Sequence, residues 1–133
     1  MSTKKKLTRS PERVRNQGEV FTPSDLAQKA VQRWMHISFR KPEDVFVDLQ
    51  CGTGHLLQAV LKWKLENNVS REMALRTILG VDISQDNVDD CRRILLNTIG
   101  AGDEEIYYQI VQKNIIQGDS VQKDISNLFP NYE

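Results

Sequence analysis

Short apolar runs alternate with amphipathic segments along this chain. Three runs have the length and apolar character of buried strands, at residues 45–49, 77–82 and 110–116. Between them, apolar side chains recur at helical spacing over residues 56–65 and 88–95. The order strand, helix, strand, helix, strand predicts an α/β fold with three parallel strands, flanking helices and right-handed crossovers.

Turn and capping residues mark where these elements begin and end. Cys51-Gly52-Thr53-Gly54 predicts a tight turn after the first strand. Ser70 is placed to cap a short helix that runs through Arg76. Ser84 is placed to cap the following helix, and Gly100 predicts its end.

Composition restricts the class of protein. The chain has 133 residues, of which 39% are hydrophobic and 27% charged, as expected of one soluble globular domain. No apolar run approaches the roughly 20 residues that span a bilayer, and no apolar stretch near Met1 indicates a secretory signal. Two cysteines and two histidines are too few for a disulfide framework or a structural zinc site. We therefore expect reduced thiols, no metal site and no membrane segment, in a cytoplasmic protein.

Positive charge is concentrated at the N-terminus. Residues 1–15 carry six basic side chains and one acidic one, whereas the whole chain has a formal net charge of zero. We divide the chain into a flexible basic arm, residues 1–16, and one domain, residues 17–133. Such an arm is attracted to DNA phosphates through counterion release, although a solvated tail that aids solubility is the simpler interpretation. At the start of the domain, Thr22 is placed to cap a helix that runs to about His36.

Acidic residues and glycines follow the predicted strands at positions suited to ligand binding. Asp48 ends the first strand, and Gly52 and Gly54 allow the backbone to approach a ligand closely. Asp82 ends the second strand, where a carboxylate can accept both hydroxyls of a ribose. Asp119 follows the third strand, where it can accept a hydrogen bond from an adenine amino group. Each of the two later acids can also simply cap a helix or face solvent.

The spacing of these residues departs from the dinucleotide-binding fingerprint. Leu57 stands where the third glycine is expected, and Asp82 comes 28 residues after Gly54, rather than about 20. No Gly-Lys-Ser/Thr phosphate loop is present. Asp48 would repel a pyrophosphate but suits a cationic ligand. S-adenosylmethionine carries an ammonium and a sulfonium group, so we expect this cofactor.

Four successive motifs resemble those of adenine-N6 DNA methyltransferases, most closely type I restriction-modification subunits and their phage relatives. They are Gly18-Glu-Val-Phe-Thr-Pro23, Val47-Asp-Leu-Gln-Cys-Gly-Thr-Gly54, Gly80-Val-Asp-Ile83 and Gln117-Gly-Asp-Ser120. The resemblance implies a partial Rossmann-like, S-adenosylmethionine-dependent methyltransferase fold. In that family the Phe-Thr-Pro segment closes over the cofactor, the glycine turn holds its amino-acid end, and later acids hold ribose and adenine. The cofactor-binding residues implied here are Phe21, Thr22, Asp48, Gly52, Gly54, Asp82, Ile83 and Asp119.

The sequence also departs from the family pattern. Leu49-Gln50 stands where the family usually has Pro-Ala, and the catalytic Asn/Asp-Pro-Pro-Tyr/Phe tetrapeptide is absent. That element binds the target amino group of the flipped base. We therefore expect no catalytic residue in the isolated chain. Three functions remain: a non-catalytic cofactor-binding domain, part of an active DNA adenine methyltransferase completed by another chain, and a cofactor-free module that binds nucleic acid or protein.

The family topology predicts an open edge on the first strand. It places the second and third strands on one side of the first, and the strands of the other side are not found in this sequence. An exposed apolar edge invites pairing. We expect a homodimer or a partner chain to cover the edge of residues 45–49.

Overall fold

Three strands form the sheet of the computed structural model, which describes residues 41–120 and 125–130. They are β1 (Phe46–Asp48), β2 (Ile78–Asp82) and β3 (Ile115–Gln117). All three are short and mostly apolar, each ending in a polar residue, and every residue of β2 is buried.

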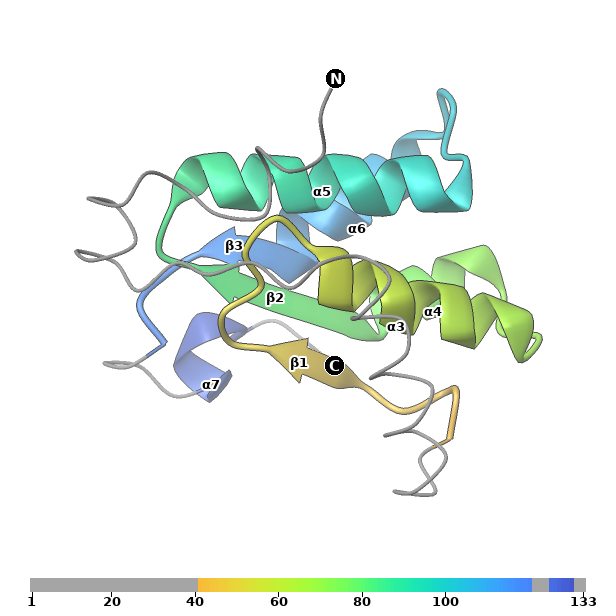
Figure 1. Cartoon of the computed structure of the whole chain (residues 1–133), viewed down its shortest axis with the longest axis horizontal. Coiled ribbons are helices and arrows are strands. Elements are labelled where there is room, and N and C mark those ends of the chain that lie inside the picture. Colours follow the sequence, from red (N-terminus) through yellow and green to blue (C-terminus); the bar gives the residue numbers. More distant parts are fainter. Residues whose placement is uncertain (1–40, 121–124, 131–133) are drawn as a thin grey trace.

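The strands pair in parallel in the order β1-β2-β3, with β2 in the middle (Figure 1). Val47 pairs with Leu79, and Val81 pairs with Ile116. This sheet and its flanking helices confirm the predicted α/β class with three parallel strands, an arrangement compatible with a partial Rossmann-like fold.

Helices connect the strands and follow the last one. Within the described residues they are α3 (His55–Glu66), α4 (Arg71–Arg76), α5 (Gln85–Ile99), α6 (Glu105–Asn114) and α7 (Ile125–Leu128). As Figure 1 shows, α3 and α4 lie between β1 and β2 along the chain, and α5 and α6 lie between β2 and β3.

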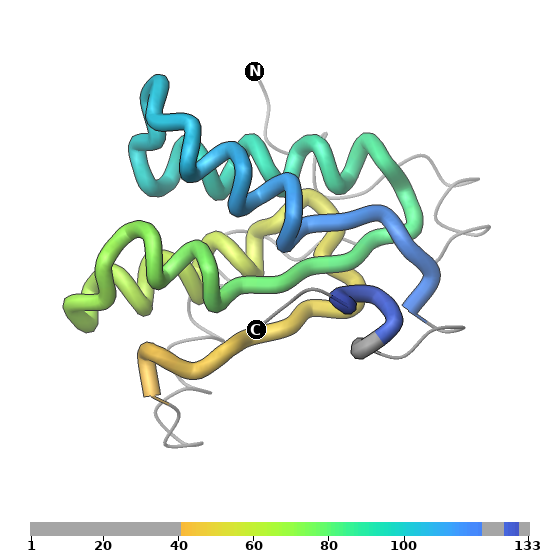
Figure 2. Tube along the Cα trace, turned by 180° about the vertical axis from the view of Figure 1, so that it is seen from behind, coloured from red at the N-terminus to blue at the C-terminus, as the bar shows by residue number. Residues whose placement is uncertain are grey.

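The two faces of the sheet are covered very differently. Successive residues of a strand point to opposite faces. Ile78 belongs to the main core, which is built mostly from α3, α4, α5 and α6. Leu79 and Val81 belong to a second, smaller cluster, where they pack against Leu128 and Phe129 at the end of α7. Figure 2 shows α7 in dark blue beside the ends of the strands. One face of the sheet therefore has a thick helical layer, and the other is covered by a short segment in the described part.

Several predicted boundaries are confirmed. The Ser70 side chain accepts a hydrogen bond from the backbone N–H of Met73 at 3.2 Å, so it caps α4 as expected. Gly100 ends α5 in the left-handed conformation, with a φ of 63°. Ser84 precedes α5, but its hydroxyl bonds the carboxylate of Asp86 at 2.7 Å instead of capping the helix backbone.

The predicted strand at residues 110–116 is wrong over most of its length. Helix α6 continues to Asn114, and β3 begins only at Ile115. On α6, Tyr107, Ile110 and Val111 are buried at helical spacing against α4 and α5. A short apolar run does not distinguish a strand from a buried helix, and packing against neighbouring helices decided this one.

A buried lysine joins α3 to the segment before β1. Lys64 lies on the core side of α3, and 1% of it is exposed. Its ammonium donates hydrogen bonds to the carbonyl oxygens of Pro42 at 2.7 Å and Asp44 at 2.5 Å. Burial lowers the pKa of Lys64 to about 8. These bonds help to position β1, because they hold the chain just before the strand begins.

Two of the expectations fall outside the part of the chain that is described. The basic arm at residues 1–16 and the helix that runs to about residue 36 both lie there. Among residues 41–120 and 125–130, none of the helices has the length and apolar character needed to cross a bilayer.

Candidate functional site

Two aspartates end neighbouring strands at the same edge of the sheet. Asp48 is the last residue of β1, and Asp82 is the last residue of β2. The pKa of Asp48 is raised, mainly because the carboxyl is buried. A hydrogen bond from the backbone N–H of Gln50 to its Oδ1, at 3.0 Å, acts in the opposite direction. The negative charge of Asp82 raises the pKa further. In the described part of the chain, no lysine or arginine forms an ion pair with either aspartate. The carboxyl ends of β1 and β2 therefore carry concentrated negative charge.

The Asp82 carboxylate holds the glycine turn in place. Its Oδ2 accepts a hydrogen bond from the backbone N–H of Gly52 at 2.9 Å. Its Oδ1 accepts hydrogen bonds from the backbone N–H of Ser84 at 2.9 Å and from the side-chain amide of Asn87 at 3.0 Å. Only 4% of Asp82 is exposed, and Asn87 is fully buried. Both oxygens are thus already engaged inside the protein, and the carboxylate joins two segments that are 30 residues apart.

The glycine turn has a conformation and a packing that require Gly54. Its φ is 96°, in the left-handed region, and a Cβ here would lie 2.8 Å from the Cys91 sulfur and 2.9 Å from Cγ2 of Ile94. The turn therefore lies directly on α5. Gly54 is also the N-cap of α3 and offers no capping side chain, so the backbone N–H groups at the start of that helix have no side-chain cap.

Both cysteines are buried packing residues: Cys51 is the first residue of this turn, and Cys91 lies on α5 beneath it. Cys51 is 5% exposed and Cys91 is fully buried. A hydrogen bond with Cys91, together with burial, raises the pKa of the Cys51 thiol. A thiol held in its neutral form is a poor nucleophile, so the environment of Cys51 is that of an inert core residue.

The end of β3 lies against the end of β2. The backbone N–H of Gly118 donates to the carbonyl oxygen of Asp82 at 3.0 Å, and the Gln117 side-chain amide donates to that of Ile83, also at 3.0 Å. Asp119 comes next in the chain and is partly buried. Ile83 has 49% of its surface exposed, so an apolar side chain stands open to solvent directly after Asp82.

Most of the residues expected to bind the cofactor are therefore found at one edge of the sheet or on the turn above it. These are Asp48, Gly52, Gly54, Asp82, Ile83 and Asp119. Phe21 and Thr22 lie outside the described residues. Within the described part, no group of three or more His, Cys, Asp or Glu side chains is arranged to hold a metal ion.

Two polar residues near the turn are not among those that the sequence motifs indicate. Asn87 stands one turn before Cys91 on α5, and a polar residue at such an apolar position is a signal that the sequence does carry. Thr53 lies in the glycine turn, and its hydroxyl is buried without a hydrogen-bond partner among the described residues. A buried hydroxyl of this kind is unusual, and no sequence pattern reveals it.

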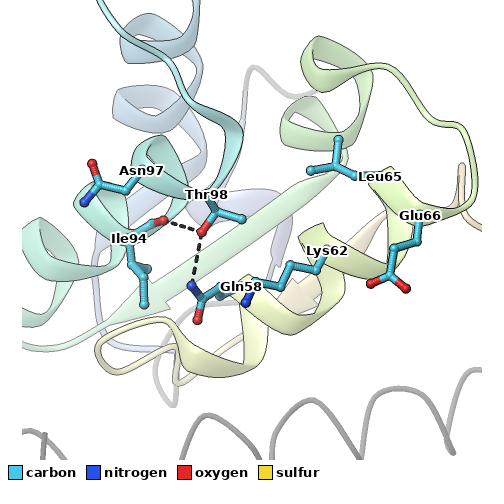
Figure 3. A pocket seen from close by; sticks show the side chains of 7 residues that line it. All are labelled: Gln58, Lys62, Leu65, Glu66, Ile94, Asn97 and Thr98. Carbon is cyan, nitrogen blue, oxygen red and sulfur yellow. Dashed lines mark hydrogen bonds between the residues drawn. The ribbon is translucent and has the colours of Figure 1, made fainter.

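Two pockets lie to the side of this edge, between α3 and α5. The larger, of about 520 Å³, is an open groove in which the Gln58 amide donates to the Thr98 hydroxyl at 3.2 Å, and Thr98 donates to the carbonyl oxygen of Ile94 at 2.6 Å (Figure 3). The smaller, of about 120 Å³, is lined in part by Thr53 and Arg93. Neither pocket is lined by any of the expected cofactor-binding residues that lie in the described part of the chain, so we base the candidate site on the strand ends.

Comparison with known proteins identifies no relative. No protein-family model, curated protein or solved structure matches the chain.

Proposed function

We propose that this chain is an S-adenosylmethionine-binding domain resembling DNA adenine-N6 methyltransferases, and that it does not transfer methyl groups as an isolated chain. The observation that carries the proposal is the pair of carboxylates, Asp48 and Asp82, at adjacent strand ends beside the turn at Gly52. A cofactor with a sulfonium and an ammonium group fits an edge with this charge, whereas a pyrophosphate does not.

The electrostatics of Asp48 support a cationic ligand. In the free chain, burial and the neighbouring Asp82 both oppose the charged form of Asp48, and its pKa is raised. A bound cation relieves this repulsion, because it provides the opposite charge that the described residues do not supply. Binding energy is thus available for the positively charged end of the cofactor.

The surroundings of Asp82 offer contacts for an adenosine group. Ile83 presents an exposed apolar side chain next to Asp82, and Asp119 follows β3 at the same edge. Because both Asp82 oxygens already accept hydrogen bonds, a ribose hydroxyl would have to share an oxygen with the Gly52 N–H or replace it. Asp82→Ala is therefore a poor test of binding, since it would also release the glycine turn.

Asp48→Asn is the sharper test. Asparagine keeps an oxygen for the Gln50 N–H and removes the charge. Isothermal titration of the whole chain with S-adenosylmethionine should show binding, and Asp48→Asn should weaken it by about tenfold, the loss expected for one charge-assisted contact. The affinity for S-adenosylhomocysteine, which lacks the sulfonium charge, should fall less in Asp48→Asn than the affinity for S-adenosylmethionine does.

Asp103→Asn is the matched control, because it removes the same charge from an exposed turn between α5 and α6. It should leave the affinity unchanged. No heat of binding at millimolar cofactor, or equal losses in both variants, would contradict the proposal.

A further inference from the structure

The two oxygens of the Asp82 carboxylate have different kinds of donor. Oδ1 accepts two hydrogen bonds from the segment that follows it, one from the backbone N–H of Ser84 at 2.9 Å and one from the side-chain amide of Asn87 at 3.0 Å. Oδ2 accepts one bond, at 2.9 Å, from the backbone N–H of Gly52, which is 30 residues away in the sequence. Ser84 and Asn87 are tied to Asp82 by the start of α5, whereas Gly52 is near it only while the glycine turn keeps its place. The bond at Oδ2 is therefore the exchangeable one.

The glycine turn covers this carboxylate. Asp82 has only 4% of its surface exposed, and all the residues of the turn, 51–54, are buried. A carboxylate oxygen can accept two hydrogen bonds, so Oδ2 has the capacity for a second donor. Because the turn buries it, however, a ligand hydroxyl has no path to Oδ2 in this conformation. The hydroxyl reaches that oxygen only when the Gly52 N–H moves away.

The peptide between Cys51 and Gly52 is the part of the turn that can rotate. The turn is held on both sides of it, because the Cys51 N–H donates to the carbonyl oxygen of Val81 at 2.8 Å and Gly54 packs on α5. Gly52 has a φ of 54°, and glycine also adopts negative φ without a steric cost. The Thr53 hydroxyl, buried without a partner among the described residues, raises the free energy of the closed turn. Rotation of this peptide thus uncovers Oδ2 while both ends of the turn stay in place.

We propose that the hydrogen bond between Gly52 and Asp82 is a latch that one ribose hydroxyl of the cofactor replaces, so that Asp82 binds the ribose through Oδ2 alone. The inference rests on the proposed function, since it needs an adenosine ligand. It departs from the expectation that this carboxylate accepts both ribose hydroxyls, because Oδ1 already has two donors and no capacity for a third. The exchange keeps the number of donors at the carboxylate constant, so its buried charge remains compensated.

Amide hydrogen exchange, measured by NMR on the isotope-labelled whole chain, shows whether the latch is closed in the free protein. The Gly52 N–H should exchange at least about tenfold more slowly than the Gly102 N–H, because hydrogen-bonded, buried amides open rarely. Gly102 is the matched control: its φ is 55°, and within the described part of the chain its N–H makes no hydrogen bond. Equal exchange rates at the two glycines would overturn the latch.

Saturation with S-adenosylmethionine then tests the exchange of donors. Gly52 should lose its protection, and Gly54 should lose protection with it, because the Gly54 N–H donates at 3.0 Å to the Cys51 carbonyl of the same planar peptide. Ser84, which donates to Oδ1, should stay protected.

The outcomes separate this inference from the proposed function. If calorimetry shows binding while Gly52 stays protected, the latch is overturned and the proposed function stands. Loss of protection at both Gly52 and Ser84 would also overturn it, because both oxygens would then have exchanged their donors. If no heat of binding is found at millimolar cofactor, the proposed function fails and the latch fails with it.

The 2′-deoxy and 3′-deoxy forms of S-adenosylhomocysteine test recognition by a single oxygen. One of them should bind about fivefold more weakly than S-adenosylhomocysteine itself, which corresponds to the net value of one hydrogen bond, and the other should bind as tightly. Equal weakening of both would show that the carboxylate accepts both hydroxyls. Equal affinity of all three ligands would show that it accepts neither, and either result would overturn the inference.

Discussion

The Ser120 hydroxyl donates a hydrogen bond to the carbonyl oxygen of Leu49 at 2.9 Å, across 71 residues of sequence. Leu49 follows β1 and Ser120 follows β3, which are the two outer strands of the sheet. The bond therefore joins the ends of two strands that do not pair with each other. The bond lies at the same end of the sheet as Asp48 and Asp82.

This bond predicts a modest stability loss on truncation of its donor. Ser120→Ala should lower the free energy of unfolding by about 0.5–1.5 kcal/mol, the net value of one hydrogen bond. Urea denaturation measures this directly. Ser120→Thr keeps the hydroxyl and should recover most of the loss; equal losses in both variants would show that the bond contributes nothing.

The packing of Gly54 on α5 predicts a larger effect. In Gly54→Ala the left-handed backbone costs about 1–2 kcal/mol, and the overlap of the new methyl with Cys91 and Ile94 adds about 1–3 kcal/mol. Gly102→Ala is the control, because its φ is also positive, 55°, but a Cβ there would meet no atom within 4 Å. It should show only the backbone cost. Equal denaturation midpoints for the two variants would contradict this account of the turn.

The lowered pKa of Lys64 predicts a pH-dependent stability. The folded chain releases the Lys64 proton near pH 8, whereas the unfolded chain keeps it up to the ordinary value of 10.5. Between these values the unfolded state binds more protons, so the free energy of unfolding rises with pH. The rise, relative to Lys64→Met, should reach about 3 kcal/mol at most.

Denaturation of both proteins at several pH values between about 7 and 10 checks this prediction. Lys62→Met is the matched control, because Lys62 lies on the same helix and is partly exposed. The free energy of unfolding of Lys62→Met should change with pH in the same way as that of the wild type. If the free energy of unfolding of Lys64→Met also follows the wild type across this pH range, burial does not lower the pKa of Lys64.

Cofactor affinity should depend on pH through Asp48. Burial raises the pKa of this carboxyl, so it takes up a proton at a higher pH than an ordinary aspartate does. Affinity for S-adenosylmethionine should then fall as the pH is lowered through that raised pKa, because the protonated acid no longer attracts a cation. Titrations from about pH 8 down toward 3.8, the ordinary pKa of an aspartate, should show this fall in the wild type and a much weaker one in Asp48→Asn. Identical pH profiles would exclude Asp48 from the interaction.

Methyl transfer should be absent from the isolated chain. The sequence lacks the Asn/Asp-Pro-Pro-Tyr/Phe element that binds the target amino group in the family it resembles. Incubation with tritiated S-adenosylmethionine and unmethylated DNA should give incorporation equal to that of a sample without protein. Incorporation above that level would refute the prediction, and an adenine-free DNA would then serve as the specificity control.

Local patterns were sufficient for part of the fold. The serine that caps α4 and the glycine that ends α5 were predicted because their conformational preferences act within a few residues. The boundary between α6 and β3 was not, because Ile110 and Val111 suit either a strand or a buried helix. Their burial against α4 and α5 resolved the ambiguity, and that burial depends on residues far away in the sequence.

The candidate site divides in the same way. Its positions were determined by the sequence alone, because parallel strands that end in Asp48 and Asp82 must bring these residues to one edge. Tertiary structure alone decided which contacts the side chains make. At the site, Asp82 turns inward to Gly52 and Asn87. At the other end of the sheet, Lys64 is buried and bonds the carbonyl oxygen of Pro42. Periodicity predicts on which face a residue lies. The bonds of Asp82 with Gly52 and of Lys64 with Asp44 depend on backbone groups that folding brings near from 20 or more residues away.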